Sequence, residues 1–87
     1  MTRDEIFNEV KGALVEMFRL DAATVTMDAR LVEDLDLDSI DAIDMAAKVQ
    51  DFTGDRLAES DLRRIRTVGD VVEVIDTMLK VKFQKGG

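Results

Sequence analysis

The chain has 87 residues, enough for one compact domain, and 46% of them are apolar, which suits a folded chain rather than a disordered one. It contains no His and no Cys, so it lacks the usual neutral-pH general base, a thiolate nucleophile and the preferred zinc ligands; this argues against an enzyme. The net charge of −7 is concentrated in residues 28–61, which carry eleven acidic and three basic residues. Such a surface repels nucleic acid and attracts basic patches on proteins.

The first predicted element is a helix over residues 3–18. Thr2 followed by Glu5 is the pattern of a capping box, which marks the start of a helix. Apolar residues then recur at helical spacing on one stripe: Ile6, Val10, Leu14, Met17 and Phe18. No apolar run is long enough to span a membrane, and the first residues do not resemble a signal peptide. We therefore expect a cytoplasmic protein, a monomer that does not insert into membranes.

A long connection follows, at about residues 19–37. A loop of this length is unusual in a small domain unless it packs down or has a function. It carries isolated apolar residues that predict packing across the bundle: Leu20, Val25, Leu31, Val32 and Leu35.

The second helix is predicted from Ser39 to Phe52, capped by Asp38 together with Asp41 and ended by Gly54. It has two apolar faces. One face contains Ala42, Met45, Ala46, Val49 and Phe52, and the opposite face contains Ile40, Ile43 and Ala47, flanked by Asp44 and Asp51. Two interpretations of the second face stay open: the long loop covers it, or it is a docking strip with an apolar centre and an acidic rim. The two can coexist, with Ile40 and Ile43 only partly covered.

A short helical turn is predicted near residues 59–65, and the last helix starts at Thr67, which forms a capping box with Asp70. Its apolar stripe contains Val68, Val71, Val72, Ile75, Met78 and Leu79. Residues 81–87 show no clear pattern and are expected to form a flexible tail, which leaves a domain over residues 1–80. The predicted fold class is all-α, a bundle of three long helices plus one short helix.

The sequence excludes two other classes of protein. Asp34-x-Asp36-x-Asp38 imitates the start of a calcium-binding EF-hand loop, but Ser39 stands where that loop needs Gly and Met45 where it needs Glu. The C-terminal Gly-Gly is typical of ubiquitin-like modifiers, but their fold needs strands and the periodicity here is helical. We expect no bound metal. An acidic helical adaptor without a prosthetic group remains an alternative.

Two motifs resemble those of the acyl carrier protein family. Residues 33–41 read Glu-Asp-Leu-Asp-Leu-Asp-Ser-Ile-Asp, against the family's Glu-Asp-Leu-x-x-Asp-Ser-Leu/Ile-Asp. Residues 65–70 read Ile-Arg-Thr-Val-Gly-Asp, against Ile-x-Thr-Val-Gly-Asp. Both motifs stand in the family's order and spacing, and the resemblance covers about residues 3–80. A lone Asp-Ser-Ile would be a weak signal, but the two motifs together are specific.

The resemblance implies that Ser39, preceded by Asp38, binds 4'-phosphopantetheine covalently. A transferase would move this group from coenzyme A to the hydroxyl, and its thiol would hold acyl intermediates as thioesters for fatty-acid or polyketide-type synthesis. A serine in the first turn of a helix places a phosphate near free backbone N–H groups and the positive end of the helix dipole. A peptidyl or aminoacyl carrier is the alternative within this class, but such domains tend to be less acidic.

The resemblance also implies the partners: a phosphopantetheinyl transferase and acyl-processing enzymes with basic docking patches. They would contact Ile40, Asp41, Ile43, Asp44, Ala47 and Asp51. The resemblance implies an acyl shelter between the helices, and the alternative for its residues is ordinary core: Phe7, Leu14, Met45, Val49, Leu62 and Val71. Departures from the family pattern, among them Asp36 in place of a common Gly, Lys48 in the second helix and a basic short helix, indicate a specialised pathway.

Overall fold

The computed structural model describes the backbone of residues 1–86 and the side chains of residues 1–81, and this part of the chain is helical without any strand. The elements in chain order are α1 (Arg3–Phe18), the 3₁₀ turn η1 (Ala22–Thr24), α2 (Ser39–Thr53), α3 (Glu59–Arg64) and α4 (Val68–Gly86). The predicted class of three long helices and one short helix is confirmed. The turn η1 was not predicted.

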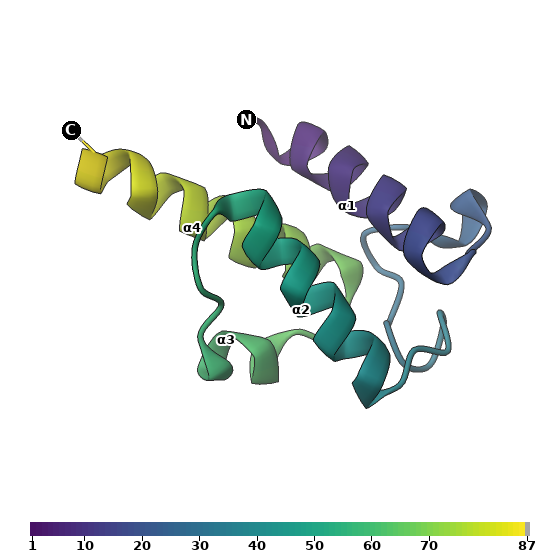
Figure 1. The fold of residues 1–87 in the computed structure, drawn as a ribbon. Helices are drawn as coiled ribbons and strands as arrows, with labels where there is room; N and C mark the ends of the chain where they lie inside the picture. Colours follow the sequence, from purple (N-terminus) through teal and green to yellow (C-terminus); the bar gives the residue numbers. More distant parts are fainter. Residues whose placement is uncertain (87) are drawn as a thin grey trace.

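The long loop separates α1 from α2 and runs around one end of the bundle, as Figure 1 shows. Helix α1 packs mainly against α4, and α2 also contacts α4. The two termini lie on the side away from the start of α2. The loop leads directly into the beginning of α2, which lies away from the chain ends.

Capping boxes start the first and last helices as predicted. The N–H of Thr2 donates to the Glu5 carboxylate at 2.8 Å, and the N–H of Glu5 donates to the Thr2 hydroxyl oxygen at 3.2 Å. The Asp70 carboxylate accepts from the N–H groups of Arg66 and Thr67 at 2.9 and 3.0 Å. Burial alone would raise the pKa of Asp70, but these hydrogen bonds outweigh it and lower the pKa below its ordinary value.

The helix ends differ slightly from the prediction. Helix α2 continues one residue further, to Thr53, before Gly54 ends it in the left-handed conformation (φ 71°) that Gly adopts without steric cost. The backbone of α4 continues as helix through Gly86, where the sequence predicted a tail over residues 81–87. Gly87 and the side chains after Val81 lie outside the described residues. The domain limit at residue 80 and the flexibility of the tail stay predictions.

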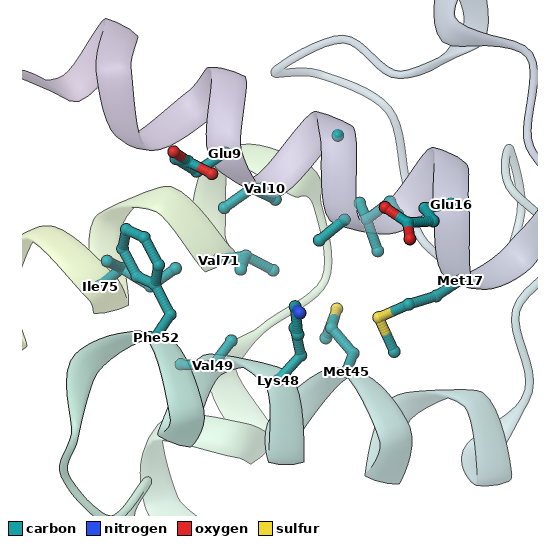
Figure 2. Close-up of a pocket in the computed structure, with 13 residues that line it drawn as sticks. Glu9, Val10, Glu16, Met17, Met45, Lys48, Val49, Phe52, Val71 and Ile75 are labelled. Carbon is teal, nitrogen blue, oxygen red and sulfur yellow. The ribbon is translucent and has the colours of Figure 1, made fainter.

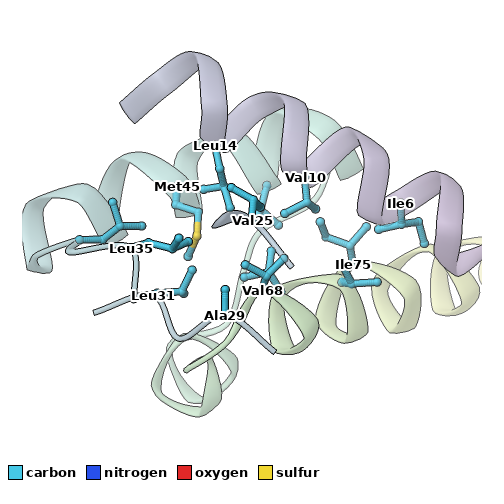
Figure 3. Close-up of a cluster of buried hydrophobic side chains, with 14 residues drawn as sticks. Ile6, Val10, Leu14, Val25, Ala29, Leu31, Leu35, Met45, Val68 and Ile75 are labelled. Atoms are coloured by element: carbon cyan, nitrogen blue, oxygen red, sulfur yellow. The ribbon is translucent and has the colours of Figure 1, made fainter. Parts of the chain in front are cut away.

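The loop forms part of the core. Of the fourteen buried apolar side chains among the described residues, five belong to it: Val25, Ala29, Leu31, Leu35 and Leu37 (Figure 3). Full burial of such a Val or Leu side chain stabilises a fold by about 1.5–3 kcal/mol, so these residues hold the loop down firmly. The expectation for Val32 is wrong, because its side chain is 62% exposed while Leu31 and Leu35 take the inward positions of this turn.

Backbone hydrogen bonds fix the loop to the start of α4. The three bonds run from Leu31 N–H to Arg66 O at 2.9 Å, from Val68 N–H to Ala29 O at 3.0 Å and from Gly69 N–H to Met27 O at 2.8 Å. A Cβ atom at Gly69 would lie only 3.0 Å from the Met27 oxygen. The absence of a side chain at Gly69 thus permits the close approach of the two segments.

We expect Gly69→Ala to lower the free energy of unfolding by about 1 kcal/mol, because the Met27 carbonyl must move and its hydrogen bond weakens. Gly12→Ala is the matched control: a Cβ there meets no atom within 4 Å, and alanine is the better helix former by about 1 kcal/mol. Urea unfolding followed by circular dichroism measures both. A Gly69→Ala protein as stable as Gly12→Ala would contradict the close approach.

Candidate functional site

Ser39 is the first residue of α2, and it is exposed. The preceding Asp38 caps the helix: its Oδ1 accepts from the N–H of Ile40 at 3.0 Å and from the N–H of Asp41 at 2.9 Å. The Asp41 carboxylate accepts in return from the N–H of Asp38 at 3.1 Å. The predicted capping box is therefore confirmed. It fixes the backbone on both sides of Ser39 without using the Ser39 hydroxyl.

The cap leaves fewer free N–H groups near Ser39 than the sequence predicted. A phosphate on Ser39 was expected to lie near free N–H groups of the first turn, but Asp38 already occupies those of Ile40 and Asp41. The positive end of the helix dipole remains near Ser39. The arrangement fits an exposed phosphodiester on the hydroxyl better than a phosphate enclosed by backbone donors.

The backbone just before the cap adopts an uncommon conformation. Asp36 has φ 58°, in the left-handed region where glycine is usual and where aspartate is tolerated better than most residues. The Asp36 N–H donates to the carbonyl oxygen of Val32 at 3.1 Å, and the N–H of Leu37 donates to the carbonyl oxygen of Leu31 at 3.0 Å. The departure from Gly at this position thus preserves a glycine-like turn, which directs the chain into Asp38.

An ion pair closes the same turn on its other side. The Arg30 guanidinium donates to the Asp34 carboxylate at 3.2 and 3.3 Å, and the Arg30 N–H donates to it at 2.7 Å. The guanidinium, and then the backbone N–H, lower the pKa of the Asp34 carboxyl below its ordinary value. This acidic group therefore has a structural partner within the loop.

The outer face of α2 is not covered by the loop. Ile40 is 69% exposed and Ile43 is 64% exposed. Asp44, Ala47 and Asp51 are exposed as well, whereas Asp41 is half-buried in its cap. Full covering of this face by the loop is therefore excluded. The residues form an open strip, apolar in the centre and acidic at the rim.

Two cavities lie on the inner side of α2. We call the first the Ser39 cavity: it has a volume of about 310 Å³ and is bounded by the loop, by α3 and, next to Ser39, by Asp38 and Ala42. The second, the α1–α2 cavity, has about 260 Å³ and lies between α1, α2 and α4 (Figure 2).

The residues expected around an acyl chain divide between these two cavities. Leu14, Val49 and Val71 line the α1–α2 cavity, and Leu62 lines the Ser39 cavity. Met45 lines both. Phe7 lines neither, although it packs against the core. The single shelter predicted from the sequence therefore corresponds to two cavities in the structure.

Val32 is a site residue that the sequence analysis misplaced. It is largely exposed, yet it also lines the Ser39 cavity, so it presents an apolar surface near the start of α2. No periodic signal could have found it, because the turn around it is irregular. Within the described residues, no group of three or more His, Cys, Asp or Glu side chains could hold a metal ion. No helix in this part of the chain is long and apolar enough to cross a bilayer.

Comparisons with known proteins identify the family of the chain. Residues 8–75 match the model of the family described as "Phosphopantetheine attachment site". Acyl carrier protein 2 of Ralstonia nicotianae is 44% identical over 79 residues, covering 91% of this chain and 98% of its own. The acyl carrier protein of Coprothermobacter proteolyticus is 38% identical over 82 residues, covering 94% of this chain and all of its own. A solved structure of the acyl carrier protein from Enterococcus faecalis matches with a TM-score of 0.73 and 30% identity, covering 88% of this chain and 98% of that chain.

The helical bundle and the family match define a phosphopantetheine-binding carrier domain. The chain belongs to the acyl carrier protein family. Members of this family carry acyl groups and are not catalysts, so the chain is a carrier rather than an enzyme, and its prosthetic group is phosphopantetheine.

Two substitutions separate the cap from the charge at Asp38. Asp38→Ala removes the acceptor for two N–H groups and should lower the free energy of unfolding by about 1 kcal/mol. Asp38→Asn keeps a capping oxygen and removes the charge, so its stability should stay within about 0.5 kcal/mol of the wild type. Thermal and urea unfolding measure both. Equal stability of the alanine variant and the wild type would refute the capping role.

Proposed function

We propose that Ser39 is the residue that carries 4'-phosphopantetheine and that the protein holds acyl intermediates on it for fatty-acid or polyketide-type synthesis. The observation that carries this proposal is the exposed Ser39 in the first turn of α2, where Asp38 rather than Ser39 supplies the cap and also lines a mainly apolar cavity. The family match, which spans residue 39, supports it. When bound, the group supplies a terminal thiol, which this chain lacks because it has no cysteine.

The chain's own part in attachment is limited to presenting a hydroxyl. The Ser39 oxygen forms a new bond to the phosphorus that carries pantetheine in coenzyme A, and the bond from that phosphorus to the adenosine bisphosphate breaks. The hydroxyl proton passes to a base of the transferase. Asp38 holds the serine backbone in place by capping α2.

We further propose that the outer strip of α2 binds the transferase and the acyl-processing enzymes. The strip consists of Ile40, Asp41, Ile43, Asp44, Ala47 and Asp51. The exposure of two isoleucines within an acidic surface supports this, because large exposed apolar groups mark sites of protein contact. Each exposed ion pair should add less than about 1 kcal/mol, so the complexes are weak, sensitive to salt and quickly reversed.

No observation favours a peptidyl or aminoacyl carrier, and the acidic segment over residues 28–61 supports the fatty-acid or polyketide side. The specialised pathway, the monomeric state and the cytoplasmic location stay predictions.

The attachment is tested by intact mass spectrometry before and after incubation with coenzyme A and a broad-specificity phosphopantetheinyl transferase. The wild type should gain the mass of one phosphopantetheine, and Ser39→Ala should gain none. A second carrier protein shows that the transferase is active. A folded wild-type protein that gains no mass under these conditions would leave the acidic adaptor as the better interpretation.

The docking strip is tested through the kinetics of the same transfer. Ile43→Ala should lower kcat/KM about tenfold, a loss of about 1.4 kcal/mol, mainly through KM and at any salt concentration. Asp44→Asn should lower it only at low salt, because screening removes its contribution. Val81→Ala is the matched control, an exposed apolar residue on α4 outside the strip. Equal kinetics for Ile43→Ala and Val81→Ala would exclude the strip as the docking site.

A further inference from the structure

One side chain stands between the two cavities on the inner side of α2. Among the described residues, Met45 alone lines both the Ser39 cavity and the α1–α2 cavity. Leu31 borders the former and Leu14 the latter, and Figure 3 shows Met45 between these two leucines. Each of the three is less than a tenth exposed. Met45, a buried and packed residue, therefore lies at the boundary between the two cavities.

The inner stripe of α2 places this side chain on the path that leads inward from Ser39. Ala42 borders the Ser39 cavity, Met45 follows three residues later, and Val49 borders the α1–α2 cavity a further turn along. At 1.5 Å per residue, Met45 lies about 9 Å from Ser39 along the helix axis. A chain that enters the Ser39 cavity and follows α2 therefore meets Met45 before it can reach the second cavity.

Met45 is held in place by close packing. Its side chain is 4% exposed and belongs to the main cluster of buried apolar residues. Protein interiors are packed as densely as organic crystals, so a guest that passes Met45 must displace it and break its contacts. The unbranched thioether fills an irregular gap without branching into either cavity.

We propose that Met45 is the wall of the Ser39 cavity that limits how long an acyl group the protein can shelter. The proposal rests on the attachment of phosphopantetheine at Ser39. Acyl groups that fill the Ser39 cavity are protected from water, and the ends of longer ones remain in solvent. Truncation of Met45 joins the two cavities and extends the protected length.

The test loads wild type and Met45→Ala with acyl-phosphopantetheine groups from butyryl to palmitoyl and measures the rate of thioester cleavage by hydroxylamine. The best-protected chain should be longer in Met45→Ala, and its palmitoyl thioester should be cleaved several-fold more slowly than that of the wild type. Met45→Leu is the matched control, because it keeps the volume of the wall at a small cost in stability and should keep the wild-type dependence on chain length. The proposal would be overturned if a loaded, folded Met45→Ala protein showed the same dependence of the cleavage rate on acyl-chain length as the wild type.

Met45→Ala removes buried atoms and could cost about 2–5 kcal/mol, so a second measurement uses the wild type alone. Methyl NMR spectra of the loaded series should show shifts at Leu31, Leu37 and Leu62, which line the Ser39 cavity, and none at Val10 or Val49, which line the other. Shifts at Val10 and Val49 with long chains would refute a closed wall. A protein that takes up no phosphopantetheine would overturn both proposals, whereas a loaded protein that fails these tests would overturn only this one.

Discussion

The attachment of the loop to the start of α4 is the constraint on which the rest of the structure depends. Hydrogen bonds from Leu31, Val68 and Gly69 join segments that are far apart in the sequence, and the leucines of the loop enter the core beside them. The end of this loop sets where α2 begins. The position of Ser39 relative to the bundle therefore depends on contacts between residues 35 to 42 positions apart in the sequence, not on α2 alone.

Local signals made most of the fold predictable. Capping boxes and the glycine after α2 involve residues two to four positions apart, so the sequence alone identifies them. The loop was harder, because irregular backbone has no period that distinguishes inward from outward residues. Val32 was therefore placed in the core while Ala29 and Leu37 were overlooked. The exposure of the outer face of α2 and the division of the interior into two cavities depend on tertiary packing, which no local pattern encodes.

Helix α2 serves two surfaces with opposite chemical requirements. Met45 and Val49 on its inner face are buried and contribute to folding, whereas Ile40 and Ile43 on its outer face remain mostly exposed and contribute little to it. Substitution of the outer residues should thus alter recognition with little effect on stability. Substitution of the inner residues should alter stability and cargo capacity together, because the same side chains form the core and the walls of the cavities.

The cap formed by Asp38 also affects how freely an attached arm can swing. Because its carboxylate already holds the N–H groups of Ile40 and Asp41, a phosphate on Ser39 would find neither donor to grip it, and the arm would pivot at its base. The tethered thiol would then reach a docked enzyme at an effective concentration on the order of millimolar, set by the length of the tether. Rotation of the arm would then interconvert two states: one with the acyl group in the cavity and one with the acyl group delivered to an enzyme. An enzyme then needs only to bind the delivered form more tightly to draw the acyl group out.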